Sequence, residues 1–100
     1  MGGTDFASIP ETIAMLNSYS RRTIIETLAE QRMTTGQLQR FVPVKQPTLT
    51  YHVHLLQKAH LIGADWEEPG FHVNTSQIRL LSSYVDRYLM PRESRLSIFY

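Results

Sequence analysis

Hydrogen-bonding side chains recur at helical spacing in the segment from Lys45 to Ile62. At about 100° per residue, one side of a helix here carries a hydroxyl, a phenol, an imidazole and an amine, from Thr50, Tyr51, His54 and Lys58. The opposite side is apolar and consists of Leu49, Val53, Leu56 and Ala59. Because the polar side lacks carboxylates, it can bond to base edges without repelling phosphate. The spacing predicts a helix with one face in the core and the other in a DNA groove.

The distribution of charge agrees with this prediction. The formal net charge of the 100-residue chain is only +1, but no acidic residue lies between Gln31 and Ala64. The same interval contains four cations, which are Arg32, Arg40, Lys45 and Lys58. A basic middle third between acidic ends polarises the molecule, which is typical of a nucleic-acid-binding protein.

Several other classes of function are disfavoured by the residues. The chain has no cysteine, so thiolate metal sites and disulfides are excluded. His52 and His54 would point about 160° apart on a helix and cannot share an ion, so we expect no metal or other cofactor. The sequence shows neither a nucleophile with its base nor a glycine loop for phosphate, so we expect no enzyme. Without an apolar run long enough for a signal or membrane span, we expect a cytoplasmic protein with no membrane contact.

The elements before this segment are predicted to be three helices. Residues 1–7 form a flexible lead-in, and a capping box from Ser8 to Glu11 starts a helix that ends near residue 17. Ser20 is the expected cap of a second helix, from residue 21 to about 31. A third, short helix starts from Thr34 with Gln37, ends before Pro43, and buries Leu38, Phe41 and Val42. This third helix and the helix at about residues 46–59 together form a helix-turn-helix.

A hairpin and a last helix are predicted after the helix-turn-helix. Ile62, Ala64 and Trp66 alternate along one face of a strand, residues 67–70 form a type II turn, and Phe71 and Val73 belong to the second strand. Asn74 with Gln77 caps a helix from residue 75 to about 90, which Pro91 ends. The fold class is therefore mainly α with a small β-hairpin: a winged helix-turn-helix of about five helices plus a wing, spanning residues 8–90 before a tail at 91–100.

The last helix carries more apolar surface than so small a domain can cover. Packing on the protein's own core is one explanation, and a homodimer interface with the first helix is the one we favour. The residues predicted at this interface are Ile13, Leu16, Ile78, Leu81, Tyr84, Val85, Tyr88 and Leu89.

Two blocks of the sequence resemble the ArsR-type winged-helix regulators. The family's recognition helix commonly reads Ser-Gln-Pro-x-apolar-Ser-x-His-Leu-x-x-Leu-x-x-Ala-Gly-Leu-Val. Its matches here are Gln46, Pro47, Leu49, Thr50 for Ser, His52, Val53 for Leu, Leu56, Ala59, Leu61 and Ile62. Upstream, residues 16–25 (LNSYSRRTII) are similar to the family's Leu-x-Asp-Pro-Thr-Arg-Arg-x-Ile-Leu. The resemblance covers residues 9–89 and implies a dimer formed by the first and last helices.

The chain departs from the family pattern at three places. Lys45 replaces the serine that caps the recognition helix, and His60 stands where glycine ends it. We expect a cation at the mouth of the helix and a strained, left-handed His60. The wing carries Asp65, Glu67 and Glu68 where the family has cations, so we expect it to be passive or to contact a protein.

The wheel and the resemblance together define the expected site. Base contacts are predicted for Gln46, Thr48, Thr50, Tyr51 and His54. Phosphate contacts are predicted for Thr34, Thr35, Arg40, Lys45 and Lys58. His52 lies on the flank of the helix, where packing or a structural hydrogen bond is favoured over a DNA contact. Arg21 and Arg22 are left out of the site, because arginines at a helix start are usually solvated or paired.

The sequence thus predicts a transcriptional regulator, acting as a repressor, that binds a pseudo-palindromic double-stranded DNA operator as a homodimer. The alternative is a winged-helix protein-interaction module that uses the acidic wing and the apolar tail, Leu96 to Tyr100. A small-molecule or protein effector is a further possible partner that no residue identifies.

Overall fold

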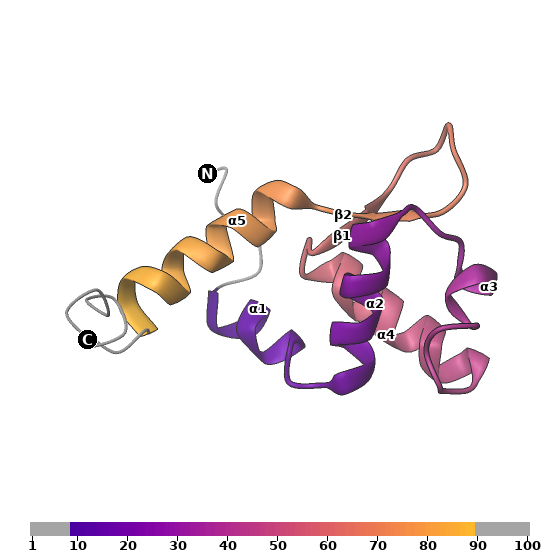
Figure 1. Cartoon of the computed structure of the whole chain (residues 1–100), viewed down its shortest axis with the longest axis horizontal. Coiled ribbons are helices and arrows are strands. Elements are labelled where there is room, and N and C mark those ends of the chain that lie inside the picture. The colour runs from indigo at the N-terminus through magenta and orange to yellow at the C-terminus, as the bar shows by residue number, and fades with distance from the viewer. Residues whose placement is uncertain (1–8, 90–100) are drawn as a thin grey trace.

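The computed structural model describes residues 9–89, and side chains as far as Arg87. The expected lead-in at 1–7, the Ser8 cap, Pro91 and the tail at 91–100 lie outside the described residues. The elements follow the order of a winged helix-turn-helix (Figure 1), with helices α1 (Ile9–Met15), α2 (Tyr19–Glu30), α3 (Thr35–Leu38) and α4 (Gln46–Lys58), strands β1 (Ile62–Ala64) and β2 (Phe71–Val73), helix α5 (Thr75–Tyr84) and a π-helical turn η2 (Val85–Leu89). The predicted fold class is confirmed.

The start of α2 differs from the prediction by two residues. Ser18, in an extended conformation, is its N-cap, and its hydroxyl accepts a hydrogen bond from the backbone N–H of Arg21 at 3.2 Å. The predicted cap Ser20 is wrong, because it already lies inside the helix. A serine at either position could cap a helix. Only Ser18 has the extended backbone that an N-cap needs, because Ser20 is already helical.

The helix-turn-helix is built from short-range signals that the sequence carries. The predicted capping box of α3 is confirmed, since the Thr34 hydroxyl accepts from the Gln37 N–H while the Gln37 side chain accepts from the Thr34 N–H. Leu38 and Val42 are buried as expected. Phe41 is 53% exposed, so its predicted place in the core is wrong. The helix ends at Leu38, and the following turn directs Phe41 outward.

The wing is a two-stranded antiparallel hairpin in which Ile62 pairs with Val73 and Ala64 with Phe71. A third segment joins it, because Met33 and Phe71 exchange two backbone hydrogen bonds, of 3.3 and 2.7 Å. Trp66 was predicted to continue the first strand, but the strand ends at Ala64 and the indole is 92% exposed. Residues 65–70 form a six-residue loop in place of the four-residue turn predicted.

The core lies where α2, α4 and the base of the wing meet. Its largest fully buried apolar side chains are Ile24, Leu38, Val42, Leu49, Leu56 and Leu61. Helix α5 packs against α1 and closes one side. Its predicted cap is confirmed, because Asn74 Oδ1 accepts from the Gln77 N–H at 3.3 Å. Among the described residues, no helix is long and apolar enough to cross a membrane.

Candidate nucleic-acid interface

Helix α4 is held by one face and exposes the other, as predicted. Leu49, Val53 and Leu56 are buried against α2, α3 and β1. All five side chains predicted to contact bases are exposed, which are those of Gln46, Thr48, Thr50, Tyr51 and His54. Opposite the buried stripe, Tyr51, His54 and Lys58 fall within one sector of the helix, whereas Gln46 and Thr48 lie at its two edges. The centre of the exposed face is therefore a phenol, an imidazole and an ammonium group.

The start of α4 is shaped by the turn that leads into it. Lys45 is the N-cap, with φ −72° and ψ 157°, and provides no side-chain cap, as expected. The side chain of Gln39 donates a hydrogen bond to the carbonyl of Val44, which ties α3 to this turn. The first turn of a helix attracts anions through its N–H groups and dipole, and the exposed ammonium of Lys45 adds a positive charge at this end of α4.

The other predicted phosphate contacts differ in how accessible they are. Arg40 and Lys58 are exposed, whereas Thr34 and Thr35 are half-buried. The Thr34 hydroxyl already accepts the Gln37 N–H at 3.2 Å as the cap of α3. The same hydroxyl donates to Oε1 of Gln37 at 3.4 Å, so a phosphate bond to Thr34 would have to replace that acceptor.

Arg21, which sequence reasoning left outside the site, contacts the flank of α4. Its guanidinium Nη1 donates to the Nδ1 of His52 at 3.2 Å, and its Nε donates to the carbonyl of Met15 at 2.6 Å. The pKa of the His52 imidazole is lowered below its ordinary value of 6.5, mainly by partial burial and to a smaller extent by the positive charge of Arg21. The structural hydrogen bond favoured for His52 is confirmed. The pair is 31 residues apart, so no local spacing could have revealed it.

The acidic wing has an internal counter-charge that the sequence did not reveal. Arg32 is paired with Asp65 at 2.7 Å and Glu68 at 3.7 Å, and also donates to the carbonyl of Gly70 at 3.3 Å. One of the four cations of the basic middle third is thus turned toward the wing. The other three cations of this interval, Arg40, Lys45 and Lys58, are exposed.

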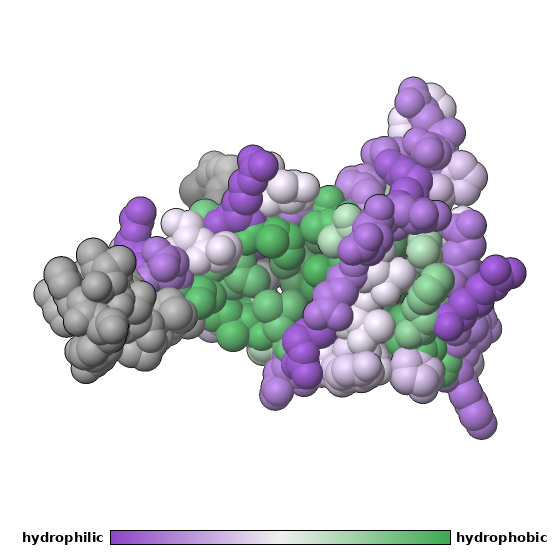
Figure 2. All heavy atoms as spheres, viewed as in Figure 1, coloured by the Kyte–Doolittle hydropathy of each residue, from purple (hydrophilic) through white to green (hydrophobic). Residues whose placement is uncertain are grey.

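The residues predicted at a dimer interface fall into two groups. Leu81 is only 5% exposed and belongs to the core of the single chain, while Ile13, Leu16, Ile78, Tyr84 and Val85 are half-buried. The side chains of Tyr88 and Leu89 lie outside the described part. Figure 2 shows hydrophobic residues gathered over α1 and α5, whereas the wing is hydrophilic. The apolar face predicted from the sequence is therefore partly used by the chain's own core.

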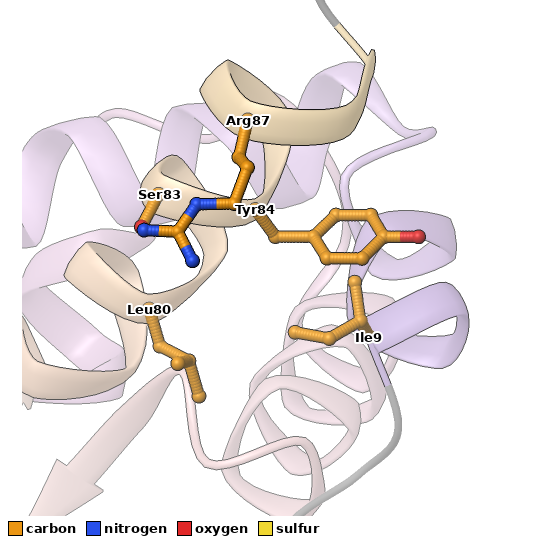
Figure 3. Close-up of a pocket in the computed structure, with 5 residues that line it drawn as sticks. All are labelled: Ile9, Leu80, Ser83, Tyr84 and Arg87. Carbon is orange, nitrogen blue, oxygen red and sulfur yellow. The ribbon is translucent and has the colours of Figure 1, made fainter.

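A small hollow lies on this face between the end of α5 and the first residue of α1. It has a volume of about 150 Å³ and is lined by Ile9, Leu80, Ser83, Tyr84 and Arg87. Figure 3 shows the ring of Tyr84 over Ile9 and the guanidinium of Arg87 near Ser83. Leu80, which is 53% exposed, extends the apolar rim. Among the described residues, no group of three histidine, aspartate or glutamate side chains could hold a metal ion.

Comparison with known proteins gives a likeness of fold. No protein-family model matches the chain, and no curated protein matches its sequence. Among solved structures, the chain is similar to an ArsR-like transcriptional regulator from Rhodococcus sp. RHA1, with a TM-score of 0.71 and 17% sequence identity. The match covers 91% of this chain and 88% of that chain. The chain thus has the winged helix-turn-helix fold of that regulator.

Proposed function

We propose that the protein is a sequence-specific DNA-binding transcriptional regulator. The observation that supports this most is the outer face of α4, where Tyr51, His54 and Lys58 are exposed opposite the buried stripe and no carboxylate is present. An α-helix with such a face fits the major groove, whose base edges present both donors and acceptors. The fold shared with an ArsR-like regulator supports the same proposal.

Within this proposal, the side chains of α4 divide their tasks by chemistry. Gln46 can bond in a bidentate manner to adenine, and Thr48, Thr50, Tyr51 and His54 can bond to base edges or contact thymine methyl groups. Arg40, Lys45 and Lys58, with Thr34 and Thr35, would contact phosphates. These contacts set the register on the duplex and the salt dependence of binding, whereas the base contacts set the sequence.

The regulator is proposed to act as a homodimer and as a repressor. The half-buried apolar side chains of α1 and α5, together with the exposed Leu80, provide the surface for a second copy. Leu81 would support this surface from below, because the core already buries it. A two-fold dimer would place two copies of α4 in successive major grooves, about 34–36 Å apart. A bound dimer of this kind blocks a promoter that overlaps its operator. We propose no enzymatic role.

The test uses a substitution on the reading face with a matched control. Tyr51, which is 58% exposed at the centre of α4, is replaced by alanine, and Tyr19, which is 69% exposed at the start of α2, is replaced in the same way. Fluorescence anisotropy with an operator duplex chosen from random sequences then gives each Kd. We expect Tyr51→Ala to weaken specific binding roughly 5- to 100-fold. Tyr19→Ala should bind like the wild type. Equal affinities for both variants would contradict the proposal.

A second candidate function is favoured by the wing alone. Trp66 is 92% exposed beside Asp65, Glu67 and Glu68, and aromatic side chains of this kind often anchor protein interfaces. Arg32 is paired with both Asp65 and Glu68, but its single positive charge cannot balance three carboxylates. The surroundings of the indole therefore stay negative and favour a basic protein over DNA.

The indole itself distinguishes the two uses of the wing, because Trp66 is the only tryptophan in the chain. Its fluorescence emission is recorded while operator DNA is added to saturation. If the wing serves a protein partner, the emission maximum should stay unchanged. A blue shift or strong quenching on DNA binding would place the wing against the duplex and contradict this second candidate.

A further inference from the structure

Arg21, in α2, forms hydrogen bonds that link the end of α1, the start of α2 and helix α4. Its Nε donates to the carbonyl of Met15, the last residue of α1, at 2.6 Å. Its backbone N–H donates to the Ser18 hydroxyl, the cap of α2. Its Nη1 donates to His52 of α4 at 3.2 Å. The guanidinium therefore connects the end of α1 to the helix that we propose reads DNA.

The contact with His52 specifies the protonation state of the imidazole. An arginine side chain can only donate hydrogen bonds, so Nδ1 of His52 has to accept and carries no proton. Protonation of this nitrogen would place two cations 3.2 Å apart and break the bond. The charged group that acts on His52 is Arg21 of α2, and the ring of Tyr51 lies beside it in α4, with centroids 5.9 Å apart. Among the described residues, no carboxylate contributes to its pKa shift.

His52 is placed where it can fix the orientation of α4 about its own axis. It lies on the side of the helix that turns toward α2, next in sequence to Tyr51, whose side chain is on the exposed face. A rotation of α4 that separated His52 from Arg21 would turn Tyr51 by the same angle. Because hydrogen bonds to bases fail after displacements of about 1 Å, such a rotation would reduce specific affinity.

We propose that Arg21 is a positioning residue that holds α4, through the unprotonated His52, in its DNA-reading orientation relative to the end of α1, and that acid releases this hold. This inference rests on the proposed DNA-binding function. Since α1 also belongs to the proposed dimer surface, the guanidinium forms a direct connection between the dimer interface and the reading helix. Any coupling through it is reciprocal, so DNA binding would also change the energetics of α1.

The first test compares two neighbouring arginines. Arg22 bonds to the carbonyl of Leu16 at 2.5 Å, one residue beyond the Arg21 acceptor, and is exposed. Arg21→Gln and Arg22→Gln thus remove the same charge from the same helix turn, but only the first breaks the contact with α4. We expect Arg21→Gln to weaken specific operator binding roughly fivefold to tenfold, and Arg22→Gln less than about twofold. Equal losses would show that charge alone matters, and would overturn the proposal.

The second test replaces the acceptor without removing it. The amide oxygen of asparagine can stand close to the place of Nδ1 and accept from Arg21, but it does not titrate. His52→Asn should therefore bind operator as tightly as the wild type at neutral pH. The wild type should lose affinity relative to His52→Asn as the pH falls below 6.5, because His52, whose pKa lies below that value, then takes up a proton that asparagine cannot. Both proteins contain the other three histidines, so their contributions cancel. Parallel pH profiles would contradict the proposal.

The third measurement needs no DNA and separates this proposal from the proposed function. NMR titration of the free protein should show a higher pKa of His52 in Arg21→Gln than in the wild type or in Arg22→Gln, because a neighbouring cation has been removed. Amide hydrogen exchange of α4 should be faster in Arg21→Gln alone. An unchanged pKa and unchanged exchange would refute the positioning role. If both changes occur but no protein binds DNA selectively, the DNA-binding function fails while the link between α1 and α4 stands.

Discussion

Replacement of Gly70 by alanine should destabilise the protein through two separate effects in the wing. Gly70 has a φ of +107°, a conformation that side-chain-bearing residues rarely adopt. A Cβ atom here would lie 2.9 Å from Cγ of Arg32 and 3.0 Å from both the carbonyl carbon and the oxygen of Met33. The Arg32 side chain can shift, but the Met33 backbone cannot shift freely because it exchanges two hydrogen bonds with Phe71.

The magnitude follows from these two effects. An unfavourable positive φ costs about 1–2 kcal/mol for a residue with a Cβ atom. Forcing an additional carbon against fixed backbone costs about 1–3 kcal/mol. The sum of about 2–5 kcal/mol is a large part of the 5–15 kcal/mol that usually stabilises a small domain. The variant should therefore fold with a much reduced free energy of unfolding.

Equilibrium unfolding in urea, followed by far-UV circular dichroism, measures this loss. Gly36→Ala is the matched control, because the nearest atom to its Cβ is the Thr34 hydroxyl oxygen at 3.8 Å and it lies in α3. That substitution should stabilise the protein by about 0.5–1 kcal/mol, since alanine is the better helix former. A Gly70→Ala variant within about 0.5 kcal/mol of the wild type would refute the description of a wing packed tightly on Met33.

Three further predictions concern the cap of α5, the charge of Lys45 and the titration of His52. Asn74→Ala should cost about 1–2 kcal/mol in urea unfolding, because Asn74 Oδ1 caps α5 while its Nδ2 donates to the His60 carbonyl at 2.8 Å; a neutral effect would show that neither bond matters. Lys45→Ala should reduce the slope of log Kd against log salt by about 0.9 for operator DNA, as the loss of one phosphate contact requires; an unchanged slope would exclude a Lys45–phosphate contact. The lowered pKa of His52 means that the unfolded chain binds its proton more readily, so the stabilising contribution of neutral His52 is complete above pH 6.5 and is lost as the pH falls through the folded-state pKa. Urea unfolding of His52→Asn, in comparison with the wild type across this range, should show a shallower decline in acid.

The parts of the fold that could be predicted depend on contacts within about four residues. The two faces of α4 follow from the periodicity of Leu49, Val53 and Leu56 in the sequence. The capping box at Thr34 and the cap at Asn74 are equally local, because donor and acceptor are three residues apart. His60, at φ 62°, has the left-handed conformation expected where a glycine usually ends the helix. In each case the deciding residues lie within a few positions of one another in the sequence.

The parts that were missed depend on where helices and strands end and on contacts between distant segments. Phe41 was assigned to the core from its spacing to Leu38, but the chain leaves the helix before reaching it. Trp66 was assigned to a strand by alternation, although pairing with β2 stops at Ala64. The pairing of Met33 with Phe71 and that of Arg32 with Asp65 join residues more than thirty positions apart. No periodicity within a helix or strand encodes such contacts.

The same distinction applies to the candidate site. The exposed face of α4 could be predicted from the sequence, because it is the side of the helix opposite the buried apolar stripe. The contact of Arg21 with α4 could not be predicted in this way, because its partner His52 is set by the packing of α2 on α4. The apolar surface of α1 and α5 that is left for a partner could not be predicted from the sequence either. Only the three-dimensional structure shows that Leu81 is buried in the chain's own core.

The most direct measurement of the central claim is the selection of bound sequences from random duplex DNA, with the mass of the resulting complex determined in solution. We expect a pseudo-palindromic motif whose half-sites are about 10–10.5 base pairs apart, and two chains per duplex. The same selection with Tyr51→Ala should lose or alter the preference within each half-site. A wild-type protein that enriches no sequence at low salt would contradict the claim that α4 reads DNA, as would a motif unchanged by Tyr51→Ala.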